Sequence, residues 1–284
     1  MRKYHLELIL AFLASVLGTQ SLTAADQVGA QSTGSSPNTQ TVDARALLTN
    51  ALLSSGSQAR VVGVKDFLAH GTIAVGAQGN SGDVTLKGRG DEQFRMDYVA
   101  GGQSNSWAIS NGAGQFKEPR SNKVSVIGSY NAVNQGWLTM PYMRIAVALS
   151  DPGLEVKYMG SQSIDGADAY RIRVIRHFTK QRDPKDLLAQ LRMTDYYLTT
   201  SDLKIIRMDD SVHPNRAAIG PDSYGHVFIR SIPRSILYSD FRTVDGVQVP
   251  FSVTEKVANQ QMWTIHLNDV AFDTGPSDAD FSLQ

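Results

Sequence analysis

The last part of the chain alternates extended runs with tight turns, and this restricts the possible folds more than any other feature. Two alternating runs flank Asp245-Gly246, and a third spans residues 261–272. Asp-Gly between two such runs is a strong hairpin signal, because glycine adopts positive φ without steric cost. Pro250 lacks an N–H and is therefore expected at an edge or a bulge of its strand. The pattern predicts a meander of long antiparallel strands.

The same alternation extends back over most of the chain. Asn111-Gly112 and Asp165-Gly166 are further hairpin turns between runs that repeat every second residue. No regular alternation of strands with helices supports a parallel sheet, and a sheet of about ten or more strands must curl or split. The expected fold class is therefore α+β, with a strongly curved antiparallel sheet, an open and incomplete β-barrel, whose concave face is covered by two or three helices.

Two segments carry helical signals. The first is 43–53, where apolar residues recur at helical spacing and Thr41 is placed to act as the N-cap. The second is 136–149, in which Pro141 fits the first helical turn and Arg144 is the only charge. A helix that is apolar nearly all round must be buried or must cover an apolar opening.

The amino terminus has the features of an export signal. A basic start is followed by the apolar run 8–18 and then by small residues, so residues 1–25 are expected to be a cleavable signal peptide. Residues 26–40 are rich in Gly, Ser, Thr and Gln and are expected to be a disordered linker. Residues 41–284 then form a single domain. The chain has no Cys, so no lipobox can anchor it, and a periplasmic or secreted location is predicted.

Composition argues against several functional classes. The formal net charge is +0, and about −1 once the basic leader is removed, so nucleic acid is not expected as a partner and membrane contact is transient at most. The six His show no metal-ligand spacing and no Gly-x-Ser-x-Gly elbow is present. Neither a metal, a cofactor nor an enzymatic activity is therefore predicted, although a triad assembled from distant residues stays open.

Several segments occur in an order that is known from one family. They are the 43–53 helix, the run 164–172, the tyrosine-rich strand 196–198 answered by 203–206, and the ending 238–250 closed by Phe272 and 280–281. This order resembles the LolA/LolB family of outer-membrane lipoprotein carriers and its lipoprotein-sorting relatives. In that family an incomplete barrel wraps an apolar cavity, helices form a lid, and acyl chains of a lipoprotein occupy the space. The linker and the insertions 179–192 and 213–223 depart from the dedicated carriers, which favours a more general hydrophobic ligand.

Met and aromatic side chains are the best candidates for contact with such a ligand, because they are adaptable and offer a large apolar area. The predicted ligand-binding residues are Phe94, Met96, Tyr98, Trp107, Phe116, Trp137, Met140, Tyr142, Met143, Tyr170 and Trp263. The function expected is that of a carrier or binding protein for an acyl chain, lipoprotein lipid or other hydrophobic ligand. The alternative is a periplasmic sensor or adaptor that binds an envelope protein partner. In that case the protein's own side chains fill the interior and the loop 213–223 makes the contact.

Overall fold

A large antiparallel sheet dominates the computed structural model, which describes residues 42–76, 79–132, 135–177, 187–214, 219–221 and 227–284. In chain order the strands are β1 (Asp66–Val75), β2 (Asn80–Arg89), β3 (Gln93–Ala100), β4 (Gln103–Ser110), β5 (Ala113–Lys117), β6 (Val124–Ile127), β7 (Leu154–Ile164), β8 (Ala167–Arg176), β9 (Thr194–Thr199), β10 (Ile205–Val212), β11 (Ile219–Pro221), β12 (Val227–Ile229), β13 (Ile232–Val244), β14 (Val247–Val257) and β15 (Gln260–Phe272). The helices are α2 (Ala44–Ser54), α3 (Gln58–Gly63), α4 (Ser129–Ala132), α5 (Pro141–Ser150), α6 (Leu187–Leu191) and the 3-10 helix η1 (Asp278–Phe281). The predicted signal peptide 1–25 and linker 26–40 lie outside the described residues.

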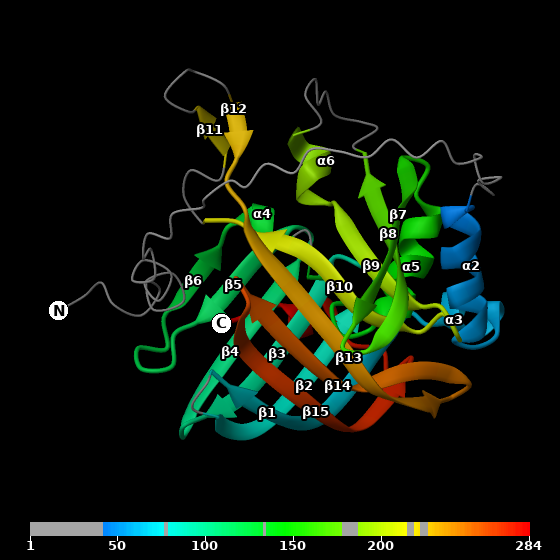
Figure 1. Ribbon diagram of the computed structural model, residues 1–284. Coiled ribbons are helices and arrows are strands. Elements are labelled where there is room, and N and C mark those ends of the chain that lie inside the picture. Colours follow the sequence, from blue (N-terminus) through cyan, green and yellow to red (C-terminus); the bar gives the residue numbers. More distant parts are fainter. Residues whose placement is uncertain (1–41, 77–78, 133–134, 178–186, 215–218, 222–226) are drawn as a thin grey trace, which may run out of the picture. The chain divides into compact units, whose positions relative to one another are not determined.

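Thirteen of the strands form one curved sheet, and β11 and β12 form a separate hairpin (Figure 1). The order in the large sheet is β6-β5-β4-β3-β2-β1-β15-β14-β13-β10-β9-β8-β7, and every pair of neighbours is antiparallel. The sheet is not closed, because β6 and β7 form its two edges. This confirms the predicted α+β class with an open, strongly curved sheet, and it agrees with the rule that so many strands must curl.

The hairpin turns predicted from Xxx-Gly pairs are present. At β13–β14 the φ angles of Asp245 and Gly246 are 48° and 80°, and at β4–β5 those of Asn111 and Gly112 are 50° and 77°. Two successive positive φ values are the requirement of a type I′ turn, whose twist matches that of the flanking strands. Local turn chemistry therefore sets the register of these hairpins.

Pro250 lies at a local edge, as its missing N–H predicted. β14 pairs with β13 as far as Val247, and Pro250 lies opposite Phe241 in that ladder. On the other side the ladder with β15 begins only at Ser252. Pro250 therefore has a strand neighbour on one side only, which is where a strand tolerates proline.

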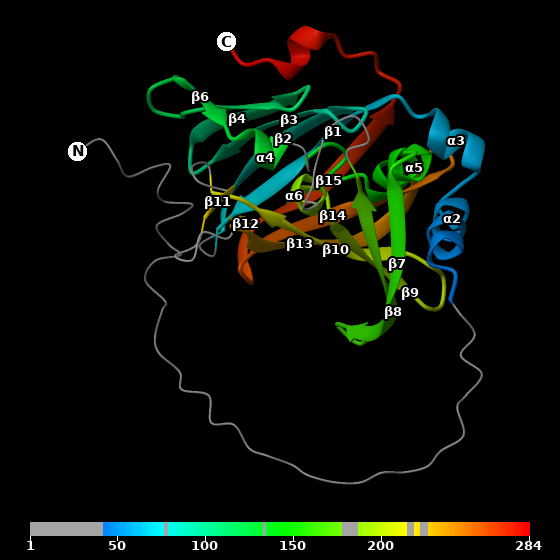
Figure 2. The same cartoon turned by 90° about the horizontal axis from the view of Figure 1, so that it is seen from above.

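Helix α5 lies inside the curve of the sheet, with α2 and α3 beside it (Figure 2). It begins at Pro141, so the preceding residues 136–140 of the predicted segment are not helical. No residue from 141 to 149 is exposed, as expected for a helix that is apolar nearly all round. The first helix, α2, is capped by Asp43 rather than by Thr41: the Asp43 carboxylate accepts a bond of 3.0 Å from the Ala46 N–H.

The main hydrophobic core lies between the concave face and these helices. Alternate residues of the strands point inward and are buried, as Phe67, Ala69 and Ile73 are in β1. They join buried residues of α2 and α5 in one hydrophobic cluster. The period of two thus selects the face of the sheet that the helices cover.

The carboxyl-terminal segment packs on β3 and β4 through η1. Phe281 of η1 is buried, and Asp280 pairs with Lys87 at 2.6 Å. Just after β15, the backbone N–H groups of Thr274 and Gly275 donate bonds of 2.6 Å and 3.1 Å to the carboxylate of Asp66 in β1. This buried carboxylate fixes the point at which the chain leaves β15.

Candidate ligand-binding site

The residues predicted to contact a ligand come together in the fold. Ten of the eleven belong to the main hydrophobic cluster or pack against it. The buried members are Phe94, Met96, Trp137, Met140, Tyr142, Met143 and Trp263, and the half-buried ones are Tyr98, Trp107 and Tyr170. Phe116 is the exception: it is half-buried on β5 and lies opposite Trp107 in the ladder with β4, outside this cluster.

Side chains of the protein itself occupy this part of the interior. Strands β3 and β15 supply one part of the predicted set, and the segment 137–143 supplies another, which packs into the same cluster. None of the seven buried members exposes more than 7% of its surface. The inner wall and its covering helix are therefore in direct contact, and a ligand that used this wall would have to take the place of the helix.

Trp137 enters the core in a strained conformation. Its φ is +57°, a region that bulky residues rarely adopt. The ring stacks on Phe67 with centroids 5.6 Å apart, and its buried indole N–H finds no hydrogen-bond partner among the described residues. A backbone outlier of this kind costs about 1–3 kcal/mol, and a buried donor without a partner about the same. Strain is thus concentrated just before α5.

The backbone around Gly136 is tightly confined. A Cβ atom added there would lie 1.7 Å from the carbonyl oxygen of Asp91, so only glycine fits. At the other end of α5, Asp151 and Gly153 form the turn into β7, where the Asp151 carboxylate accepts a bond of 2.8 Å from the Gly153 N–H. The helix is therefore bounded by a close backbone contact before it and a tight turn after it.

Within the described part of the chain, α5 is held by a small set of polar contacts, and those of its one charged residue, Arg144, are given with the pocket below. Its N-cap residue, Met140, makes no side-chain capping bond. The Tyr142 hydroxyl accepts a long bond of 3.5 Å from the Ile205 N–H, and burial raises the pKa of Tyr142 to about 12. At the other end, Arg45 of α2 donates a bond of 3.0 Å to the Leu149 carbonyl. Apolar burial therefore supplies most of the attachment of α5.

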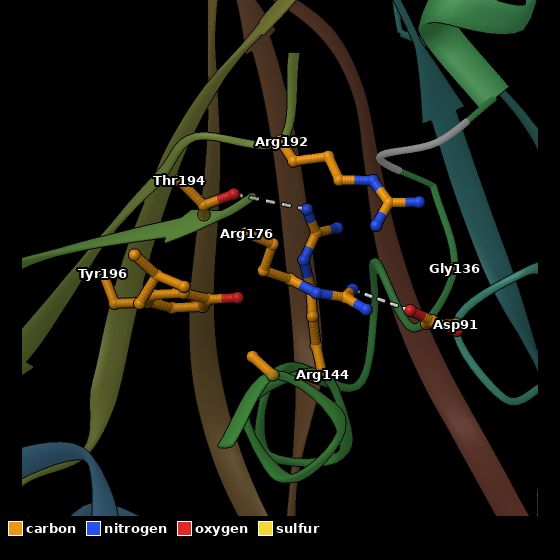
Figure 3. Close-up of a pocket in the computed structure, with 9 residues that line it drawn as sticks. Asp91, Gly136, Arg144, Arg176, Arg192, Thr194 and Tyr196 are labelled. Carbon is orange, nitrogen blue, oxygen red and sulfur yellow. Dashed lines mark hydrogen bonds and ion pairs between the residues drawn. The ribbon is translucent and has the colours of Figure 1, made fainter. Parts of the chain in front are cut away.

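A small charged pocket adjoins α5 at the ends of β8 and β9 (Figure 3). Its lining residues are Asp91, Gly136, Arg144, Ala148, Val174, Arg176, Arg192, Thr194 and Tyr196, and its volume is about 20 Å³. Three guanidinium groups converge on it, and the Tyr196 hydroxyl points toward them (Figure 3). With three Arg and one Asp, the lining has a formal charge of +2. Asp151, which is bonded to Arg176, and Asp210, 3.9 Å from Arg144, lie just outside the lining and offset part of this charge.

The three arginines of the pocket differ in their surroundings. Arg176 bridges two carboxylates, with bonds of 2.7 Å to Asp91 and 2.8 Å to Asp151. Arg144 lies 3.4 Å from the Thr194 hydroxyl and 3.9 Å from the Asp210 carboxylate. The pKa of Arg192 is lowered, first by burial and then by the positive charge of Arg176. The three guanidinium groups are therefore close to one another and partly shielded from water.

A second buried network lies on the inner face of β10, β13 and β14. Arg234 is 1% exposed and donates two bonds, of 2.7 and 2.6 Å, to Asp210. Gln135 and Glu255 accept further bonds from Arg234 at 3.0 and 3.4 Å. Burial would lower the pKa of Arg234, but the charges of Asp210 and Glu255 raise it overall. The pKa of Glu255 is raised because burial outweighs the attraction of Arg234.

Sequence reasoning did not find these two charged groups. Arg144 was recognisable as the one charge on an apolar helix, but no local signal connects it with Arg176 and Arg192, which come from β8 and the residues before β9. Likewise, Arg234 and Asp210 belong to neighbouring strands in a register that only the folded sheet defines.

A second pocket lies against the carboxyl-terminal segment and is lined by residues such as Arg95, Lys117 and Gln284. None of the eleven predicted residues lines either pocket.

The described residues contain no group of three or more His, Cys, Asp or Glu that could hold a metal ion. Within the same part of the chain, no helix combines the length and the apolar character needed to cross a bilayer. His266 lies on β15, as does the predicted ligand contact Trp263. His266 is exposed on the opposite face of the strand from Trp263.

No family model and no curated protein matches the chain. Among solved structures it is similar to an outer membrane lipoprotein-sorting protein domain from Vibrio parahaemolyticus, with 13% identity, a TM-score of 0.48, and coverage of 84% of this chain and 97% of that chain. It is also similar to a LolA superfamily protein from Nitrosomonas europaea, with 10% identity, a TM-score of 0.49, and coverage of 85% and 98%. A DUF1329 family protein from Desulfovibrio piger has 14% identity, a TM-score of 0.49, and coverage of 85% and 99%. The superfamily that the sequence resembles is thus among the matches.

Proposed function

We propose that this chain is an exported, non-catalytic binding protein of the cell envelope that holds an acyl chain or another hydrophobic ligand against the concave face of its sheet. The observation that carries the proposal is the position of α5, an apolar helix that covers the inner wall and is attached mainly by apolar burial. In this proposal α5 acts as a lid, and the ligand replaces it.

The energies of such an exchange are comparable. Burial of a large apolar side chain contributes about 1.5–3 kcal/mol, so Tyr142, Met143 and Ile145 together contribute about 5–9 kcal/mol to lid closure. Each methylene of a ligand contributes about 0.8 kcal/mol, so a chain of about twelve methylenes gains about 10 kcal/mol. A long acyl chain can therefore displace the lid, while a short one cannot, and the competing lid keeps release feasible.

Strain at Trp137 supports the same proposal. Opening of the lid would relieve the positive φ and expose the unpartnered indole N–H to water or to an acceptor on the ligand. Each effect offsets a part of the free energy that is lost when opening removes apolar contacts. Strain of this kind is typical of segments that switch between two arrangements.

The three tryptophans of the chain provide the test, because Trp107, Trp137 and Trp263 all lie in or against the cluster of the inner wall. We expect fatty acids brominated along the chain to quench tryptophan fluorescence, with affinity rising as the acyl chain lengthens from about 8 to about 16 carbons. Native mass spectrometry of the purified protein checks independently for a lipid carried through purification. Absence of quenching at every chain length, together with a protein free of lipid, would exclude the proposal.

Binding of a protein partner is the second candidate, and the filled interior favours it. If the wall and α5 remain in contact, the concave face is ordinary core and function belongs to the outer surface. The contact loop expected for this case, 213–223, lies largely outside the described residues.

The movement of α5 separates the two candidates. Because the chain has no Cys, spin labels can be placed on cysteines introduced at the exposed Ser150 of α5 and the exposed Asp269 of β15. An altered distance distribution in the presence of palmitate supports the lid. An unchanged distribution at saturating palmitate supports the partner-binding role.

A further inference from the structure

We propose that the outer face of β2–β5 is a docking surface for an acidic peptide segment that carries an aromatic residue. The chain's own residues 276–284, called the strap below, occupy this surface as an intramolecular ligand, and a partner protein with a segment of the same chemistry displaces them. The inference does not depend on a ligand in the concave face, because the strap lies on the other side of the sheet from α5 (Figure 2).

Four basic side chains lie together on this outer face. Lys87 and Arg89 are two residues apart in β2, and Arg95 of β3 lies opposite Lys87 in the ladder. The residues between and beside them along β2 and β3 are buried, so the alternation directs these three cations outward. Lys117 of β5 supplies the fourth. The carboxylate of Asp97, bonded to Arg95 at 2.6 Å, offsets one of the four charges.

The two acidic side chains of the strap bond to this basic face. Lys87 pairs with Asp280 at 2.6 Å, and Arg89 pairs with Asp278. These bonds lower the pKa of both aspartates, which therefore stay ionised at neutral pH. The Arg89 guanidinium also lies over the ring of Phe281, 5.4 Å from its centroid. The surface thus recognises negative charge and an aromatic ring next to each other.

Other side chains of the face recognise the backbone of the strap. Arg95 and Lys117 each donate a bond of 3.0 Å to a carbonyl of the strap, and the side-chain carbonyl of Gln115 accepts a bond of 2.8 Å from the Leu283 N–H. Backbone contacts of this kind are independent of the sequence that is bound. A segment from another protein would make them equally well.

Two apolar side chains anchor the strap. Phe281 is 1% exposed and Leu283 is 7% exposed, although both lie on the outside of the sheet. η1 packs on β3 and β4, where Ala108 lies opposite Arg95 and is itself buried. The small side chain of Ala108 leaves room for a ring between the basic residues. The chemistry of the occupant is therefore two acidic residues followed by an aromatic and a second apolar residue.

The strap does not fill the surface completely. A hollow of about 370 Å³ lies beside its last residues, and Arg95, Ser106 and Lys117 of the face form one side of it. This volume lies in the range of small-ligand pockets, about 300–1,000 Å³. A partner with larger side chains at this end would fill the hollow and make contacts that the strap does not make.

The strap is attached in a way that permits its release. It is not a strand of the sheet, so it can leave without breaking a ladder. The side chain of Asp278 is 87% exposed, and exposed ion pairs contribute little to stability. Asp66 fixes Thr274 and Gly275 just before the strap, and the φ of Gly275 is 72°. This anchor gives the strap a hinge and an effective concentration on the order of millimolar, so weak contacts suffice to hold it.

The test uses a fluorescently labelled peptide with the sequence of residues 274–284, titrated by anisotropy against the full chain. In the wild type the strap competes, so the peptide binds only to molecules whose strap is open. Phe281→Ala in the protein weakens the strap but leaves the face intact. We expect the peptide to bind this variant at least tenfold more tightly than the wild type. Leu283→Ala should act in the same direction and replaces Phe281→Ala if that variant does not fold.

Further variants locate the site. In the Phe281→Ala protein, Arg95→Gln and Lys87→Gln should each weaken peptide binding about tenfold or more, as expected for the loss of hydrogen bonds to charged groups. Arg242→Gln is the matched control, because Arg242 is exposed on β13 and pairs with Asp240. A peptide with both aspartates replaced by asparagine should bind about tenfold more weakly than the native peptide.

The outcomes are separate from those of the acyl-binding test. Absence of peptide binding to a folded Phe281→Ala or Leu283→Ala protein overturns the docking surface, and so does equal binding of a scrambled peptide. A wild-type dimer that the free peptide dissociates would show that the strap is exchanged between two copies of the chain, which overturns the assignment to a partner protein. Palmitate titration of the same samples tests the proposed function independently.

Discussion

If α5 competes with the ligand for the inner wall, weakening of its packing should tighten ligand binding. Ile145 is the best position for this test, because it is 0% exposed and lies on the helix rather than on the sheet. Truncation of a buried isoleucine to alanine costs about 2–5 kcal/mol. In the lid model that loss falls on the closed state alone, so Ile145→Ala lowers the free energy of opening by the same amount.

The effect on affinity follows directly. A ligand that binds only the open state binds more weakly by the fraction of molecules that are open. A loss of about 2 kcal/mol in the closed state therefore raises the apparent affinity for palmitate about 30-fold. The gain ends once the open state predominates, so the total cannot exceed the cost of opening, about 5–9 kcal/mol from the three large buried side chains of α5.

The assay is palmitate titration by tryptophan quenching, combined with urea unfolding to measure stability. Ile164→Ala is the matched control, since Ile164 is a buried isoleucine in a separate small cluster with Ala169 and Tyr197. It should lower the free energy of unfolding without a change in affinity. If Ile145→Ala remains folded but binds palmitate with unchanged or lower affinity, the lid reasoning is refuted.

Three further predictions concern the charged groups of the fold. Arg234→Met leaves Asp210 buried without its bidentate partner and should lower the free energy of unfolding in urea by about 3–5 kcal/mol. The double variant Arg234→Met/Asp210→Leu should recover most of that loss. A single variant as stable as the wild type would contradict this. The pKa of Asp195 is lowered, since bonds from Arg173 and Arg171 outweigh the opposing effect of burial. The stability that Asp195 contributes is therefore present above its ordinary pKa of about 3.9 and is lost as pH falls through the lower folded value, so the difference in unfolding free energy between wild type and Asp195→Asn should shrink below about pH 4. Asp66→Ala removes the acceptor that holds the start of the carboxyl-terminal segment and should cost about 1–3 kcal/mol, with faster proteolysis after β15 as the measurement and unchanged cleavage as the contrary result.

The sequence by itself determined the features that depend on near neighbours. Asp245-Gly246 could be assigned to a hairpin because only a few residue types accept two successive positive φ values, and the structure has them. Pro250 could be placed at an edge because its missing N–H is a property of the residue. The buried character of α5 followed from a composition with one charge, Arg144. The number of strands then made a curved, open sheet the expected outcome.

The predicted set of Met and aromatic residues shows where such reasoning ends. Period-two alternation correctly grouped most of them on one face, and ten of the eleven meet in one cluster. Periodicity does not tell whether that face lines a ligand cavity or packs against a helix, because the same apolar residue types occur in a packed core and in the wall of a cavity. Their role as ligand contacts stays a prediction.

Only the tertiary structure decided which distant groups meet. Arg144 of α5, Arg176 at the end of β8 and Arg192 just before β9 line the same pocket. No spacing along the chain encodes this proximity. Trp137 is held at positive φ by its stacking on Phe67 and by the contact of Gly136 with Asp91, against its own backbone preference. Turn chemistry and periodicity act over a few residues, whereas charge convergence and strain depend on packing between elements far apart in the chain, and packing exists only in the folded state.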